Sequence, residues 1–89
     1  MSLLRWNPRR DANEPQLIAA MGKCGLLWVR GGPLDGWIGK RGNWYPCENK
    51  APKGRLTFSQ KDFMDECARH SLPVIVLRSV SDVINFANQ

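Results

Sequence analysis

Hydrophobic residues in the first third of the chain recur at helical spacing. The apolar residues that share one face of the expected helix are Leu17, Ile18 and Met21. Asn13 is a favoured N-cap residue, and Gln16, three residues later, is suited to complete a capping box. Gly25 is typical of the position that ends a helix, because it adopts a positive φ without strain. The pattern therefore predicts a helix that begins at Asn13 and ends before Gly25.

Three short segments after this helix are typical of strands. Residues 26–30, 35–40 and 44–50 contain apolar and aromatic side chains, and glycine-containing turns separate them. The tight turn at residues 40–43 predicts that the last two segments form an antiparallel hairpin. Pro46 cannot donate a backbone hydrogen bond, so we expect it at a sheet edge or a bulge.

The last third of the chain predicts two more helices with a strand between them. Thr57 and Gln60 have the spacing of a capping box, so the second helix is expected to begin there. The unbroken apolar run of residues 74–77 is typical of a strand buried on both faces. Ser79 is expected to cap a final helix. The expected apolar stripe of that helix consists of Val80, Val83, Ile84 and Ala87.

The expected order of elements is α-β-β-β-α-β with a C-terminal helix, which places the chain in the α/β class. A strand, helix, strand passage across residues 44–77 implies one parallel strand pair with a right-handed crossover. The hairpin adds an antiparallel pair, so the sheet is expected to be mixed.

Composition narrows the class of protein. The 89 residues include 13 Lys and Arg against 8 Asp and Glu, a formal charge of +5, which points to an anionic partner. We expect a basic N-terminal arm at residues 1–12 and a single domain at residues 13–89. Three cysteines without a Cys-x-x-Cys pair argue against a disulfide framework or a zinc site and favour a reducing, cytoplasmic location. No apolar run approaches the roughly 20 residues that span a bilayer, so no membrane association is expected.

Asp35, Glu48 and Lys50 form the set of residues most indicative of chemistry. Side chains alternate along a strand, so Glu48 and Lys50 share one face, and Asp35 begins the strand expected beside theirs. Two carboxylates on one face repel each other unless a cation joins them. Mg²⁺ prefers oxygen ligands of this kind, and a bound ion lowers the pKa of water and polarises a phosphodiester. The set therefore indicates metal-assisted hydrolysis, with Lys50 orienting the water or offsetting phosphate charge.

The same residues also permit a simpler interpretation. Glu48 and Lys50 alone would form an ordinary solvent-facing ion pair, which contributes little. What favours a metal site is the surrounding set of residues, which comprises an Asp after Gly-Gly-Pro, a Glu on the preceding helix and a basic loop at residues 51–56.

Five short motifs follow one another along the chain. They are Arg9-Arg10-Asp11-Ala12-Asn13-Glu14, Gly32-Pro33-Leu34-Asp35, Gly39-Lys40-Arg41-Gly42, Cys47-Glu48-Asn49-Lys50 and Leu56-Thr57-x-x-Gln60. Together they resemble the PD-(D/E)XK nuclease superfamily and, more narrowly, small phage-type members of the virus-type replication-repair nuclease family. The resemblance covers about residues 9–86 and implies a restriction-endonuclease-like core. Leu34 is a departure, since the family name implies Pro directly before the Asp.

The resemblance implies roles for the residues that match the family motifs. Asp35 and Glu48 would ligate Mg²⁺ or Mn²⁺, with the backbone carbonyl of Asn49 as a further ligand. Lys50 would position the attacking water.

Two further residues have alternative roles. By the resemblance, Glu14 would face the site and bind the metal directly or through water; alternatively, it only complements the helix dipole. Gln60 would approach the site from the second helix; alternatively, it only closes the capping box with Thr57. For Gln60 the two roles are compatible.

The basic residues gather in short groups that suit phosphate contacts or simply form solvated surface. Lys53 and Arg55 follow the expected catalytic strand, which favours the phosphate role for them. The other candidate DNA-binding residues are Arg9, Arg10, Lys40 and Arg41. We expect Trp28, Trp37 and Trp44 to be core or subunit-interface anchors.

The motifs and the resemblance predict a metal-dependent, structure-specific endodeoxyribonuclease. By the resemblance it would act as a homodimer on branched DNA such as Holliday junctions. One alternative is a non-catalytic DNA-binding module that keeps the nuclease fold. Another is a small structural or interaction protein whose charge is incidental.

Overall fold

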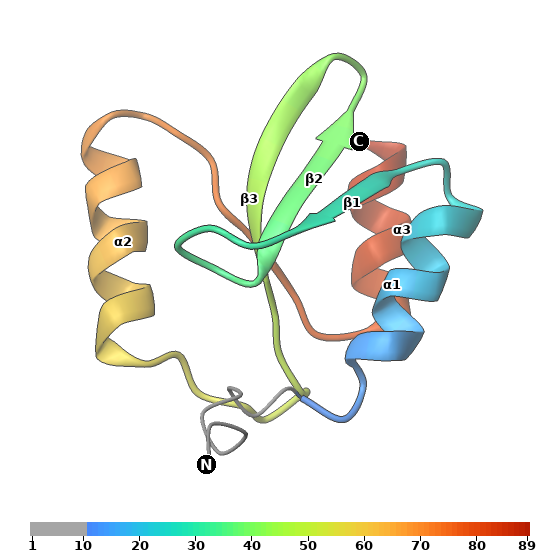
Figure 1. Ribbon diagram of the computed structural model, residues 1–89, viewed down its shortest axis with the longest axis horizontal. Coiled ribbons are helices and arrows are strands. Elements are labelled where there is room, and N and C mark those ends of the chain that lie inside the picture. Colours follow the sequence, from blue (N-terminus) through green and yellow to red (C-terminus); the bar gives the residue numbers. More distant parts are fainter. Residues whose placement is uncertain (1–10) are drawn as a thin grey trace, which may run out of the picture.

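A mixed four-stranded sheet lies at the centre of the molecule, with helices on both of its faces (Figure 1). The computed structural model describes residues 11–89, so Arg9, Arg10 and most of the expected arm lie outside the described residues. The elements are α1 (Glu14–Lys23), β1 (Leu27–Arg30), β2 (Gly36–Lys40), β3 (Asn43–Asn49), α2 (Phe58–Arg69), β4 (Ile75–Leu77) and α3 (Val80–Asn88). The predicted α/β class and order of elements are confirmed.

The strand order is β1-β2-β3-β4, with antiparallel β1/β2 and β2/β3 pairs and a parallel β3/β4 pair. Arg41 and Gly42 both have positive φ in the β2–β3 turn, as the tight hairpin requires. The parallel pair follows the α2 crossover, as expected. The prediction that residues 74–77 form a strand buried on both faces is wrong, because β4 is an edge strand in which only Leu77 is fully buried.

Pro46 lies inside β3, and the sheet accommodates it without a bulge. The Lys50 N–H donates to the Leu77 carbonyl, which places it on the β4 side of the strand. Backbone direction has a period of two, so the Pro46 nitrogen points to that same side. β4 pairs only with Cys47–Asn49, and Pro46 therefore lies beyond that ladder, where no donor is needed.

The hydrophobic core lies between the sheet and the two helices α1 and α3, which lie side by side on one face (Figure 1). We call this face the inner face and the opposite one, which α2 flanks, the outer face. The predicted helical face of α1 is confirmed, since Leu17 and Met21 are buried. The predicted stripe of α3 is partly wrong. Its buried residues are Val83 and Phe86, which lie on the side of α3 that packs against α1 and β4. Val80 and Ile84 are exposed.

Asn13 occupies the N-cap of α1, but it does not form the predicted capping box with Gln16. Its backbone is helical, with φ −86° and ψ −2°, so its side chain makes no cap hydrogen bond. The amide instead donates to the carbonyls of Lys50 and Arg78, each at 3.1 Å. Asn13 thereby ties the start of α1 to the ends of β3 and β4. Gly25 ends the helix region with φ +78°, as expected.

Gly36 opens β2 at a point where no side chain fits. A Cβ there would lie 2.4 Å from the Val29 carbonyl oxygen and 2.7 Å from the Trp28 ring. We expect Gly36→Ala to lower the free energy of unfolding by about 1–3 kcal/mol, because backbone must shift. Gly22, in α1 with open space around it, is the matched control. Gly22→Ala is expected to raise stability by about 0.5–1 kcal/mol, and equal effects of the two substitutions in thermal unfolding would contradict this account.

Candidate functional site

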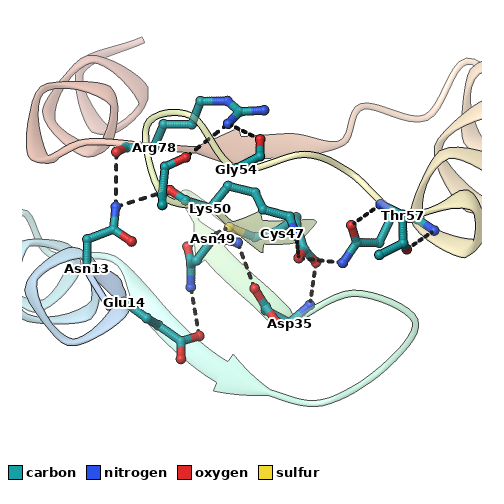
Figure 2. A network of polar contacts seen from close by, with 12 residues as sticks. Asn13, Glu14, Asp35, Cys47, Asn49, Lys50, Gly54, Thr57 and Arg78 are labelled. Carbon is teal, nitrogen blue, oxygen red and sulfur yellow. Dashed lines mark hydrogen bonds and ion pairs between the residues drawn. The ribbon is translucent and has the colours of Figure 1, made fainter. Parts of the chain in front are cut away.

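Asp35 and Glu48 meet at one end of the sheet because of the β2/β3 register. Gly36 is the partner of Cys47, which brings the residue before Gly36 next to the residue after Cys47. The Asp35 N–H donates to Glu48 Oε1 at 3.2 Å. Asp35 Oδ2 in turn accepts from the backbone N–H of Asn49 at 2.8 Å (Figure 2). The prediction that Asp35 lies beside the carboxylate of the third strand is confirmed.

Lys50 completes this group from the residue that follows β3. Its Nζ lies 3.7 Å from Glu48 Oε2, and the Lys50 and Glu48 side chains are only 12% and 3% exposed. A solvent-facing ion pair would leave both groups in water. The two charges are instead held in a partly dry environment, where their interaction is stronger than at a surface.

Gln60 both closes the capping box with Thr57 and contacts the site, so its two predicted roles hold together. Its Oε1 accepts from the Thr57 N–H at 2.8 Å, while its own N–H donates to Thr57 Oγ1 at 3.2 Å, so the predicted capping box is confirmed. Its Nε2 also donates to Glu48 Oε2 at 2.7 Å. The capping box therefore fixes the side chain that orients Glu48, and it links α2 to the site.

Glu14 reaches the group through Asn49. It is the first residue of α1, is 4% exposed and accepts a hydrogen bond from Asn49 Nδ2 at 3.3 Å (Figure 2). Its place in the first turn of α1 suits the helix-dipole role, and the Asn49 side chain links it to the strand that carries Glu48. Among residues 11–89, no three His, Cys, Asp or Glu side chains form a group placed to hold a metal ion. The two neighbouring carboxylates of Asp35 and Glu48 are the core of the candidate site.

Burial, together with neighbouring negative charge, changes the protonation of Glu48 and Cys47. Burial, reinforced by the neighbouring Asp35 carboxylate and opposed by Lys50, raises the pKa of Glu48 to about 7. Burial also raises the pKa of the Cys47 thiol, and the carboxylates of Asp35, Glu48 and Glu14 add to the effect. Cys47 lies in the hydrophobic core, where a thiol that stays protonated packs as a small apolar group.

The donor set suits a hard divalent cation. Two carboxylates provide oxygen ligands, and the high pKa of Glu48 means that a proton or a cation is needed to offset their charge. The Asn49 N–H points toward Asp35, and in an extended strand the carbonyl of the same residue points to the same side. Asp35, Glu48 and the Asn49 carbonyl therefore fit the ligands that the family resemblance implies.

The candidate DNA-binding residues lie in different places. Lys53 and Arg55 are exposed in the loop that joins β3 to α2, next to the site. Lys40 and Arg41 lie at the β2–β3 turn and bind the C-terminal end of α3. Lys40 Nζ donates to the Phe86 carbonyl at 2.7 Å and lies over the Phe86 ring, and Arg41 donates to the carbonyls of Ala87 and Gln89. Cations at a helix C-terminus stabilise it, which gives these two residues a structural role.

Two residues at the site were missed by sequence reasoning. Asn13 was expected only to cap a helix, and Arg78 was not among the grouped basic residues. The Arg78 guanidinium donates to carbonyls of the loop after Lys50 (Figure 2). Both residues bind backbone carbonyls, and every residue has a carbonyl, so no sequence motif marks these partners. The contacts can be recognised only in the folded structure, where the ends of β3 and β4 lie side by side.

Comparison of the chain with protein-family models, with curated proteins and with solved structures finds no match. Its interpretation therefore depends on the geometry described above. Within the part of the chain that the structure describes, no helix is long and apolar enough to cross a membrane.

The pKa of Glu48 predicts how metal-free stability changes with pH. Since the folded chain raises this pKa from 4.5 to about 7, protonated Glu48 stabilises the fold below about pH 4.5, and this contribution is lost as pH rises through about 7. We expect the melting temperature of the wild type, relative to Glu48→Gln, to fall across that range. Above pH 7, millimolar Mg²⁺ or Mn²⁺ should raise the melting temperature of the wild type but not that of Glu48→Gln. If the melting temperatures of the wild type and Glu48→Gln changed equally with pH and with added metal, Glu48 would be neither the titrating group nor a metal ligand.

Proposed function

We propose that the protein is a metal-dependent endodeoxyribonuclease with a restriction-endonuclease-like fold, similar to small virus-type replication-repair nucleases. The observation that carries the proposal is the group of Asp35, Glu48 and Lys50 at the end of the central strands, in which Glu48 is buried between two half-buried partners and has its pKa raised to about 7. A cytoplasmic location is part of the proposal and suits the free Cys24, Cys47 and Cys67.

In this proposal Asp35, Glu48 and the Asn49 carbonyl hold Mg²⁺ or Mn²⁺. When bound, the ion supplies Lewis-acid polarisation of the phosphodiester and a water of lowered pKa. Gln60 holds Glu48 in its ligating orientation through the 2.7 Å hydrogen bond. Asn49 fixes Asp35 through its backbone and Glu14 through its side chain. These contacts position the ligands before the substrate arrives, which reduces the reorganisation needed for hydrolysis.

Lys50 has the chemical role in this arrangement. Its ammonium group is near Glu48 and carries three donors, so it can orient a water for attack or offset charge on the scissile phosphate. Lys53 and Arg55, exposed in the adjoining loop, are placed to contact the DNA backbone. Arg9 and Arg10 remain further candidates for such contacts, whereas Lys40 and Arg41 are engaged at the C-terminal end of α3.

Cleavage assays separate the enzyme from its alternatives. We expect the protein to cut a labelled four-way junction, flap or duplex in the presence of Mg²⁺ or Mn²⁺, and not with a chelator. Lys50→Ala should lower the cleavage rate by at least about 10²-fold while DNA binding persists, because the ammonium acts in the transition state. Lys61→Ala, on the exposed surface of α2, is the matched control and should cut normally.

Each outcome of these assays favours a different function. Metal-independent binding without cutting would favour a non-catalytic DNA-binding module with a nuclease fold. Neither binding nor cutting would favour a structural or interaction protein. Equal rates for the Lys50 and Lys61 variants would remove Lys50 from the mechanism.

The outer face of the sheet supports the homodimer in this proposal. The strand register aligns two apolar rows across β1, β2 and β3. The rows are Leu27, Gly39 and Trp44, and Val29, Trp37 and Pro46. Leu27 and Trp44 are 57% and 56% exposed, although apolar side chains of this size are usually covered. No charged residue lies in either row, so this face suits a protein partner better than phosphate.

A groove on this face is lined by residues of the rows and by residues near α2, and it offers a partner an apolar surface. It has a volume of about 290 Å³ and is bounded by Trp37, Trp44 and Pro46 on the sheet and by Phe63 and Leu72 near α2. Trp44 lines this groove and is 56% exposed, so a two-fold pair that covers this face would bury the Trp44 of both copies. Such isologous contacts are the usual way that identical subunits pair. Two sites in one dimer would act on two strands of a branched DNA.

We expect the protein to be a dimer in light scattering at micromolar concentration. Trp44→Lys should give a monomer, because it buries a charge in the apolar interface. Phe58→Ser is the control, since Phe58 is 85% exposed at the start of α2 and belongs to neither row. A wild-type monomer at 100 μM, or a Trp44→Lys variant that stays dimeric, would exclude this interface.

A further inference from the structure

Arg78 lies directly after β4 and holds the loop that follows Lys50. Its Nη1 lies 3.0 Å from the Ala51 carbonyl oxygen, 2.7 Å from that of Gly54 and 3.4 Å from that of Pro52 (Figure 2). Three carbonyls converge on one guanidinium nitrogen, a geometry that gathers the loop into a fixed turn. The Gly54 N–H, which donates to the Ala51 carbonyl at 2.9 Å, closes the same turn.

This turn packs against the side chain of Lys50. A Cβ built on Gly54 would lie 3.4 Å from Lys50 Cδ and 3.3 Å from the Ala51 carbonyl oxygen. The Gly54 backbone therefore lies alongside the alkyl chain of Lys50, close enough that a Cβ at this position would be in van der Waals contact with it. The position of the loop consequently restricts where the Lys50 ammonium can lie.

The backbone of Lys50 is fixed independently at both of its polar groups. Its N–H donates to the Leu77 carbonyl at 2.9 Å, and its carbonyl accepts from Asn13 Nδ2 at 3.1 Å. The same Nδ2 donates to the Arg78 carbonyl, and the Arg78 N–H donates to Asp82 at 2.8 Å. Arg78 is thus anchored by the start of α3 while its side chain reaches the loop.

We infer that Arg78 is the positioning residue of Lys50. Through the turn at residues 51–54, it holds the Lys50 alkyl chain so that the ammonium remains 3.7 Å from Glu48. Arginine suits this role because the planar guanidinium fixes the directions of the Nη1 N–H donors, whereas the ammonium of a lysine rotates freely. The geometric part of the inference stands apart from catalysis; the effect on cleavage rests on the proposed function.

The geometric part is tested without any activity. We expect Arg78→Met to increase the rate at which an acylating reagent modifies the Lys50 amine by several-fold, measured by mass spectrometry of peptides. In the wild type this side chain is only 12% exposed and paired with Glu48, which protects it. Hydrogen exchange at the Gly54 amide should also become faster in the variant. Arg69→Met, which removes a surface pair with Glu66 on α2, is the control and should change neither rate.

A conservative variant keeps the test valid if Arg78→Met does not fold. Arg78→Lys retains the positive charge but not the planar fork, so it should give intermediate acylation and exchange rates with native circular dichroism. If either variant folds and keeps the wild-type rates of Lys50 acylation and Gly54 hydrogen exchange, the inference is wrong.

The catalytic part is tested by a double-mutant cycle. Arg78→Met should lower the cleavage rate at saturating DNA by about 10- to 100-fold, the effect of displacing a catalytic group by about 1 Å. Mn²⁺ affinity and junction affinity should be unchanged. In a Lys50→Ala background, Arg78→Met should cost nothing further, because its effect acts through Lys50. An equal loss in both backgrounds would show that Arg78 does not act through Lys50.

The two proposals fail in different ways. If the wild type cuts no DNA, the proposed function is wrong, and the acylation and exchange rates still decide the position of Lys50. If the wild type cuts DNA but the Arg78 variants keep wild-type acylation, exchange and cleavage, only the inference about Arg78 is wrong.

Discussion

The antiparallel register between β2 and β3 is the constraint on which the candidate site depends. Pairing of Gly36 with Cys47 brings Asp35 to Glu48 and lets Asn49 donate to Asp35. A shift of one residue would turn Glu48 toward the core and Cys47 toward the outer face, because side chains alternate along the strand. The tight turn at Arg41 and Gly42, together with burial of Cys47, holds the register that brings Asp35 to Glu48.

Charge at the site is stabilised by contacts from several parts of the chain. Burial and Asp35 raise the pKa of Glu48, while Lys50 opposes the shift, so the group is poised between protonated and ionised forms near neutral pH. Gln60 adds a donor from α2. Such a group is costly to a fold without a cation, which is why it points to function rather than to stability.

The two faces of the sheet differ in how far helices cover them. The inner face, with Ile38 and Cys47, is sealed by α1 and α3 and forms the hydrophobic core. The outer face carries Glu48 at one end and exposed Trp44 at the other. A chain of 89 residues has a thin core, so covering the exposed apolar side chains of the outer face would add to stability.

Local patterns in the sequence are sufficient to predict the elements and their order, through helical spacing and the capping residues Thr57 and Gln60. Strand alternation, also a local property, is sufficient to place Glu48 and Lys50 on one face. The sequence did not determine that β4 lies at an edge, or that Lys40 binds the end of α3, 46 residues away in sequence. Nor did it reveal Asn13 and Arg78, which are 65 residues apart and act on backbone carbonyls. Those contacts exist only once the sheet aligns distant strand ends, since a carbonyl acceptor is common to every residue and marks no position in a sequence.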